Sequence, residues 1–175
     1  MPGVGAGPVP VLSWRGGTEM RFLYYDRVTI IDKGKHIQGI KTFALSEEFF
    51  RGHFNRKALV PNVIYIEAMA QLLGWGIIHA HNFTLTAILS LVQGVTIGEP
   101  LLRPGFSAQI TGEIVTNTRR DSLGRAWIEV EGTRVATLDR IIFTHYRQVD
   151  PGKLADRFCY YSGWPREELQ IGDPQ

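Results

Sequence analysis

The segment from residue 62 to about residue 81 has the hydrophobic pattern of a buried α-helix. It contains no proline, and Asn62 at its start is a residue type that caps helices. Apolar residues occur on nearly all sides, which is typical of a helix in a protein interior. One narrow stripe differs, because polar and small residues recur there at helical spacing: Glu67, Ala70, Gln71 and Gly74.

Two segments before this helix have the composition of β-strands. Residues 21–32 and 36–44 are rich in aromatic and β-branched side chains, and the sequence Asp-Lys-Gly-Lys at 32–35 is typical of a turn between them. Residues 45–61 show no period, since glycine, asparagine and proline interrupt them. We therefore expect a hairpin followed by an irregular loop that leads into the helix.

After Asn82 the pattern is β throughout. Residues 106–114 alternate between apolar and polar with a period of two, and residues 126–131 and 133–146 indicate further strands joined at Gly132. We interpret residues 119–125 as a polar turn. One buried helix with mostly antiparallel strands predicts an α+β fold in which the sheet wraps around the helix.

The two ends of the chain differ from this central domain. Residues 1–19 are rich in glycine and proline and are expected to form a flexible leader, with Met20 as an alternative start. The domain itself is assigned to residues 20–149. Residues 150–175 form a tail whose aromatic side chains are expected to pack on the domain or on a partner subunit, namely Phe158, Tyr160, Tyr161 and Trp164.

Composition fits one soluble domain. The 175 residues are 44% hydrophobic and 21% charged, and the net charge of +2 gives no argument for nucleic acid or a membrane surface. Cys159 is the single cysteine, so no internal disulfide can form, which is compatible with a cytoplasmic location. The longest apolar run, residues 63–80, contains Glu67 and Gln71, so a membrane span is not expected.

Two ionisable residues near the helix start are candidates for acid and base chemistry. His53 lies in the irregular loop and Glu67 in the second helical turn. A carboxylate in a buried helix must be paired, be hydrogen-bonded or have a raised pKa. In the last case Glu67 is a competent general acid, while a neutral histidine is a base. A non-catalytic interpretation stays open, in which His53 is an ordinary loop residue and Glu67 is a hydrogen-bonded carboxylate of the core.

The segment FFRGHF, followed by PNVIYIEAMAQ, resembles the signature of the FabZ-type 3-hydroxyacyl-[acyl-carrier-protein] dehydratases. That family has G-H-F-P and then P-G-V-L-x-x-E-A-x-A-Q, with the same spacing from histidine to glutamate. A weaker resemblance begins at FLYYDRV, residues 22–28, includes the LRPG turn at 102–105, and continues to about Tyr146.

The resemblance implies a hot-dog fold, with an antiparallel sheet wrapped around one long central helix, and a double hot-dog homodimer that can assemble as a trimer of dimers. His53 would remove the C2 proton of a 3-hydroxyacyl thioester, and Glu67 would help the 3-hydroxyl group leave as water, giving a trans-2-enoyl thioester. The two residues of one site would come from different subunits. The substrate-binding residues would be Phe54, Pro61, Asn62, Val63 and Gln71. The family implies a role in fatty acid or related lipid or polyketide synthesis.

The sequence departs from the family pattern at several positions. Asn55 replaces the proline of G-H-F-P, and Asn62 replaces a glycine whose amide holds the thioester carbonyl. The family's His-Arg-Tyr-Pro is absent at residues 18–21. Residues 94–99 lack the basic cluster on which an acidic carrier protein docks, so a different carrier protein or a coenzyme A thioester is favoured over the usual acyl carrier protein.

Two other function classes remain as alternatives. A hot-dog thioesterase also uses an acidic residue on the central helix, and a non-catalytic acyl-binding or scaffold protein needs neither residue. The arginines at 119, 120 and 125 are interpreted either as a phosphate contact or, more simply, as a solvated turn. His79 and His81 point to opposite sides of the helix, so a metal pair is not expected, and no phosphate loop, dinucleotide fingerprint or zinc pattern implies a cofactor.

Overall fold

The computed structural model describes residues 22–51, 57–98 and 103–172. The predicted leader and Met20 lie outside these residues. In chain order the elements are β1 (Arg27–Asp32), β2 (His36–Phe43), η1 (Glu48–Phe50), α1 (Asn62–Ala80), β3 (Thr86–Ile97), β4 (Phe106–Asn117), β5 (Asp121–Val130), β6 (Thr133–Tyr146), α2 (Pro151–Ser162) and η2 (Arg166–Glu168).

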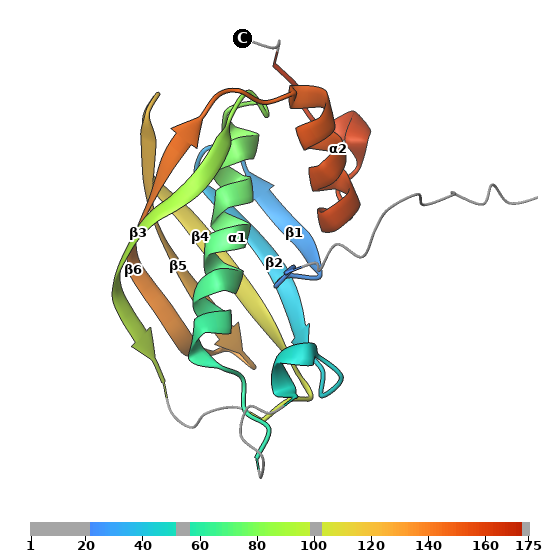
Figure 1. Cartoon of the computed structure of the whole chain (residues 1–175), viewed down its shortest axis with the longest axis vertical. Helices are drawn as coiled ribbons and strands as arrows, with labels where there is room; N and C mark the ends of the chain where they lie inside the picture. Colours follow the sequence, from blue (N-terminus) through green and yellow to red (C-terminus); the bar gives the residue numbers. More distant parts are fainter. Residues whose placement is uncertain (1–21, 52–56, 99–102, 173–175) are drawn as a thin grey trace, which may run out of the picture.

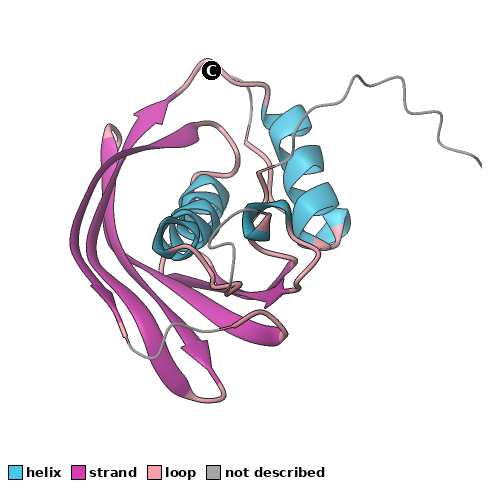
Figure 2. Ribbon diagram, turned by 60° about the horizontal axis from the view of Figure 1, so that its bottom comes forward, coloured by secondary structure: helices cyan, strands magenta, loops and turns pink. Residues whose placement is uncertain are grey.

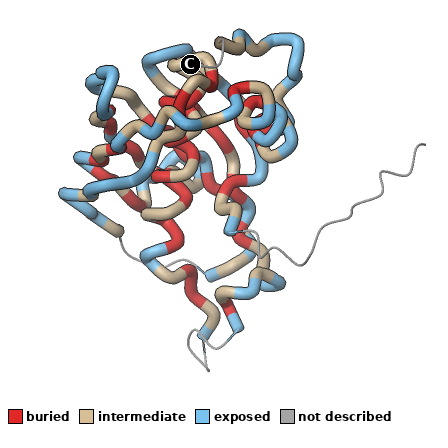
Figure 3. The backbone as a smooth tube through the Cα atoms, turned by 45° about the horizontal axis from the view of Figure 1, so that its top comes forward, coloured by how far each residue is buried: buried red, intermediate tan, exposed pale blue. Residues whose placement is uncertain are grey.

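The strands form one six-stranded antiparallel sheet in the order β1-β2-β4-β5-β6-β3. The sheet curls around α1, and α2 lies at the side that the sheet leaves open (Figures 1 and 2). Figure 3 shows that buried positions concentrate in the interior of this wrap. This is the expected hot-dog fold, built from the predicted central helix and the surrounding strands.

Glycines in the sheet allow α1 to lie close to it. A Cβ atom on Gly39 of β2 would lie 2.9 Å from a methyl carbon of Leu72. Similar atoms on Gly112 of β4 and Gly124 of β5 would lie 3.0 Å and 2.6 Å from side-chain atoms of Leu73. Leu72 and Leu73 are both fully buried. The three glycines thus form a furrow in the sheet, and Leu72 and Leu73 of α1 pack against it. A larger residue at any of the three glycine positions would fill the furrow.

The expected hairpin is formed by β1 and β2, but the predicted polar turn at 119–125 is wrong. β5 already begins at Asp121, and the turn is confined to the residues before it. Ser122 is buried because its hydroxyl donates to Asn117 Oδ1 at 2.7 Å and lies 2.9 Å from His145 Nε2. These partners satisfy a polar side chain inside the strand, and one of them, His145, lies 23 residues away. The predicted joint at Gly132 is correct, since Glu131 and Gly132 both have positive φ in the turn between β5 and β6.

The C-terminal segment contains a helix, α2, that sequence analysis did not predict. The Asp150 side chain accepts a hydrogen bond from the Lys153 amide at the helix start, and Gly163 adopts a left-handed conformation at its end. Phe158 is fully buried, with its ring centroid 5.4 Å from that of Trp75 and 5.7 Å from that of Phe83. The expected packing of the aromatic tail on the domain is thus seen at Phe158, whereas Tyr160 is exposed.

A buried lysine fixes the chain where it enters the loop before α1. Lys41 of β2 is only 5% exposed, and its ammonium group lies 3.1 Å from Asp26 and 2.5 Å from Glu47. Burial alone would lower the pKa of Lys41, but the two carboxylates outweigh it and raise that pKa. Glu47 immediately precedes η1, so this cluster anchors the segment that leads to residues 52–56.

α1 is long and apolar enough to cross a membrane, but 61% of its most apolar window is buried inside the described fold. Such burial is typical of a core helix, so this match to a membrane span is weak evidence.

Candidate functional site

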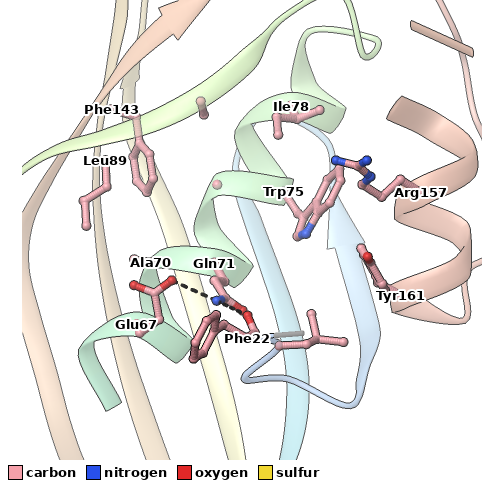
Figure 4. Close-up of a pocket in the computed structure, with 13 residues that line it drawn as sticks. Phe22, Glu67, Ala70, Gln71, Trp75, Ile78, Leu89, Phe143, Arg157 and Tyr161 are labelled. Carbon is pink, nitrogen blue, oxygen red and sulfur yellow. Dashed lines mark hydrogen bonds between the residues drawn. The ribbon is translucent and has the colours of Figure 1, made fainter. Parts of the chain in front are cut away.

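The side of α1 that the sheet does not cover borders a groove of about 370 Å³ (Figure 4). Its walls come from α1, β3, β6, α2 and the segment before β1. The lining residues are Phe22, Leu23, Glu67, Ala70, Gln71, Gly74, Trp75, Ile78, Ala87, Leu89, Phe143, Arg157 and Tyr161. The complete predicted stripe of α1 therefore faces this groove.

Glu67 is partly exposed in the groove and is hydrogen-bonded rather than isolated. Gln71 Nε2, one helical turn later, donates to Glu67 Oε1 at 2.8 Å (Figure 4). The same nitrogen donates to the Phe22 carbonyl at 2.7 Å, and Gln71 Oε1 accepts from the Tyr24 amide at 3.0 Å. Gln71 thus links the carboxylate to the chain before β1, and it also lines the groove, so its expected contact with the substrate stays a prediction.

The negative charge of Glu67 also affects the pKa of the Tyr24 phenol. Burial raises the pKa of Tyr24, and the negative charges of Glu67 and Glu47 raise it further, against a smaller opposing effect of Lys41. The phenol is therefore protonated at neutral pH and remains a hydrogen-bond donor beside Glu67.

The start of α1 differs from the expectation in one respect. Pro61 occupies the cap position and Asn62 is the first helical residue, so Asn62 is not the N-cap. The Ile64 amide donates to the Pro61 carbonyl at 2.9 Å, and within the described residues no side chain caps this helix start. Asn62 and Val63 are exposed there. Their first-turn amides are the kind of group that can hold a developing negative charge.

His53 and Phe54 lie within residues 52–56, outside the described part of the chain. The pairing of His53 with Glu67 therefore stays a prediction. The described neighbours of this segment are Arg51, which follows η1, and Lys57, which leads towards the buried Leu59 and Val60. Both ends thus connect to packed structure.

Sequence analysis missed the opposite end of the groove. Trp75 and Ile78 reach it from the second half of α1, and Arg157 and Tyr161 reach it from α2 (Figure 4). The spacing of Trp75 and Ile78 relative to Gln71 and Gly74 was available in the sequence. Arg157 and Tyr161 could be found only if α2 had been recognised from its Asp-Pro start and glycine end.

The arginines considered from sequence as phosphate contacts do not line the groove. Arg125 forms an ion pair with Glu113 on the outer surface of the sheet, and Arg119 and Arg120 are exposed in the turn between β4 and β5. The His81 ring lies 2.6 Å from Asn117 Oδ1, whereas the His79 ring packs edge-on against Phe83. These histidines therefore make separate contacts.

Comparison with known proteins relates the chain to one family. Residues 18–99 match the model of the FabA-like domain. A 3-hydroxyacyl-[acyl-carrier-protein] dehydratase FabZ from Thiobacillus denitrificans is 34% identical over 121 residues, which cover 66% of this chain and 81% of the relative. A FabZ from Caldicellulosiruptor saccharolyticus is 32% identical over 112 residues, covering 63% and 79%.

Solved structures support the same fold. The dehydratase heterocomplex ApeI:P from Xenorhabdus doucetiae gives a TM-score of 0.57 at 16% identity, covering 73% of this chain and 84% of the other. A thioesterase from Haemophilus influenzae gives 0.55 at 8% identity, covering 70% and 79%. At such identities these likenesses show the hot-dog fold alone. The sequence relatives go further, and they show that this chain is a divergent member of the FabZ-type 3-hydroxyacyl-[acyl-carrier-protein] dehydratase family of hydro-lyases.

Proposed function

We propose that this protein removes water from a 3-hydroxyacyl thioester to give the trans-2-enoyl thioester. The observation that carries the proposal is the position of Glu67, a partly exposed carboxylate held by Gln71 beside a groove that mostly apolar residues line. An acyl chain fits such a groove, and the carboxylate lies where it can act on a polar group of that chain. Membership of a dehydratase family selects dehydration among the reactions that such a site supports.

The reaction needs a base, an acid and a site for negative charge. His53 takes the proton from C2, and the resulting charge is delocalised onto the thioester carbonyl, which the amides of Asn62 and Val63 stabilise. Glu67 acts in its protonated form, after taking up a proton from solvent, and gives that proton to the 3-hydroxyl group as the C3–O bond breaks and the C2=C3 double bond forms. Water leaves, and a return of the proton from His53 to Glu67 through solvent restores the site. The proposal also assigns substrate contacts to Phe54 and Pro61.

One assay separates this proposal from its alternatives. The purified protein is given a 3-hydroxyacyl thioester and, separately, the 2-enoyl thioester, and enoyl absorbance and free thiol are followed together. Reversible hydration that is lost in His53→Ala and Glu67→Gln, but kept in the exposed control Glu168→Gln, supports the dehydratase. Thiol release without hydration identifies a thioesterase. Neither signal, with retained acyl binding, identifies an acyl-binding protein and overturns the proposal.

The proposal includes a homodimer joined through β3. This strand pairs with β6 on one side and is the terminal strand of the described sheet. It carries exposed apolar side chains, among them Ile88 and Val95 at 54% and 43% exposure. An exposed apolar edge strand favours pairing with a second copy, which gives a double hot-dog. The substitution Leu91→Glu on this edge is expected to yield monomers in light scattering.

Complementation tests whether each site draws on two subunits. His53→Ala and Glu67→Gln chains are inactive alone, but a heterodimer of the two contains one site with both groups intact. Random mixing should therefore restore about one quarter of the wild-type activity. A mixture that forms heterodimers yet stays inactive would place both residues in one subunit.

The thioester carrier and the cellular location belong to the same proposal. Coenzyme A and acyl carrier protein thioesters of one acyl group should be compared by kcat/KM, because the departures at 94–99 favour a carrier other than the usual one. We expect a cytoplasmic enzyme, with residues 1–19 as a dispensable leader before the domain of residues 20–149 and the tail of residues 150–175.

A further inference from the structure

Helix α2 forms one wall of the groove at the end away from Glu67. It is attached firmly, because Phe158 on one side is fully buried against Trp75 and Phe83. On the groove side, Arg157 and Tyr161 lie one turn apart and border the same space as Trp75 (Figure 4). α2 therefore brings polar groups to a place that the central helix leaves apolar.

The groups at this end are hydrogen-bond donors without a matching acceptor. Arg157 makes no hydrogen bond or ion pair with any residue that the structure describes, whereas the neighbouring Asp156 is paired with Arg166. A guanidinium group donates only. The buried Tyr25 hydroxyl, close to the Trp75 side chain, donates to no acceptor among the described residues. Burial raises the pKa of Tyr25, and the nearby Tyr161 adds to the rise, so this phenol stays protonated.

The middle of the groove is different in character. Between Glu67 and Trp75 it is bordered mainly by Ala70, Gly74, Leu89 and Phe143, none of which carries a charge. Glu67 and Trp75 are separated by about 12 Å along the helix axis at 1.5 Å per residue. A medium-length acyl chain whose C3 lies beside Glu67 would cross this apolar stretch and end among the donors.

We infer that α2 closes the acyl groove with a binding site for an anionic chain end, so that Arg157 and Tyr161 select 3-hydroxyacyl groups that carry a carboxylate at their far terminus. This selection rests on the proposed dehydratase function and specifies its substrate class. A carboxylate accepts from both the guanidinium and the phenol, whereas a methyl terminus leaves these donors facing an apolar group.

The test compares two phosphate-free pantetheine thioesters of equal chain length, one ending in a methyl group and one in a carboxylate. The measured quantity is the ratio of kcat/KM for the carboxylate substrate to that for the methyl substrate. Arg157→Gln should lower this ratio at least about tenfold, as loss of a charged hydrogen bond does, and salt should weaken the wild-type preference. Tyr161→Phe should lower it less. The matched control Lys153→Gln removes a charge from the same helix outside this groove and should leave the ratio unchanged.

The outcomes separate failure of the inference from failure of the function. Turnover of both substrates with the same ratio in wild type and Arg157→Gln overturns the inference and keeps the dehydratase. An Arg157 effect seen only when the pantetheine carries its phosphate would assign the cation to the carrier arm and also overturn it. Should neither substrate react, the proposed function fails. Calorimetric binding of the corresponding unreactive thioethers then decides the inference, which requires tighter binding of the carboxylate form by wild type than by Arg157→Gln.

Discussion

Replacing Gln71 with leucine removes three hydrogen bonds while keeping a side chain of similar size. The lost bonds are those to the Glu67 carboxylate, to the Phe22 carbonyl and from the Tyr24 amide. Each such bond contributes about 0.5–1.5 kcal/mol net, and partial exposure lets water replace some of it, so the free energy of unfolding should fall by about 1–3 kcal/mol. The activity should fall as well, because Glu67 loses the group that orients it.

Urea denaturation measures the first effect, and kcat/KM for enoyl hydration measures the second. The matched control is Gln109→Leu, an exposed strand glutamine with one side-chain bond to Gln38, which should change stability by no more than about 0.5 kcal/mol. A double-mutant cycle with Glu67→Gln should show a coupling of about 0.5 kcal/mol or more. Equal stability losses in Gln71→Leu and Gln109→Leu would refute the reasoning that Gln71 fixes this part of the molecule.

Three further perturbations test the packing and the pH response. Phe158→Ala should lower the unfolding free energy by about 3–5 kcal/mol, since it empties a fully buried site; a loss below about 1 kcal/mol in urea would contradict firm attachment of α2. Gly124→Ala should cost about 1–3 kcal/mol, because its Cβ would lie 2.6 Å from Leu73, whereas Gly98→Ala, with its nearest neighbour at 3.5 Å, serves as the mild control in thermal unfolding. Burial and, secondarily, the charge of Lys33 lower the pKa of His79, so the unfolded state binds a proton more tightly than the folded state does. The free energy of unfolding should therefore fall as the pH drops below about 6.5. His79→Phe should reduce this fall between about pH 7.5 and about pH 5.5, and an unchanged pH profile would exclude His79 as its source.

The central helix and its stripe were predictable because helical periodicity is local information. Glu67, Ala70, Gln71 and Gly74 share one face at any position of the helix in the fold, and the structure turns that face to the groove. The family signature added the hot-dog topology, which periodicity alone does not give. Both kinds of evidence agree on α1 as the element that presents Glu67.

Several features were missed in the sequence because they depend on contacts that only the folded chain makes. Ser122 has the polarity of a turn residue, yet it is buried in β5 through His145 and Asn117. The contacts of Gln71 with residues 22 and 24 could not be read from the sequence, because they depend on how the chain before β1 crosses the helix. Arg157 was not considered, since its importance depends on α2 lying against Trp75.

The glycine furrow beneath Leu72 and Leu73 has a consequence for the direction in which the helix faces. A helix that is apolar on nearly every side has little hydrophobic preference for one rotation about its axis, because most rotations bury similar surfaces. The furrow selects one rotation by steric fit, because only that rotation places both leucines over Gly39, Gly112 and Gly124. Glu67 projects from the other side of the same helix, so the angle at which its carboxylate enters the groove is set by three positions in the sheet that carry no side chain.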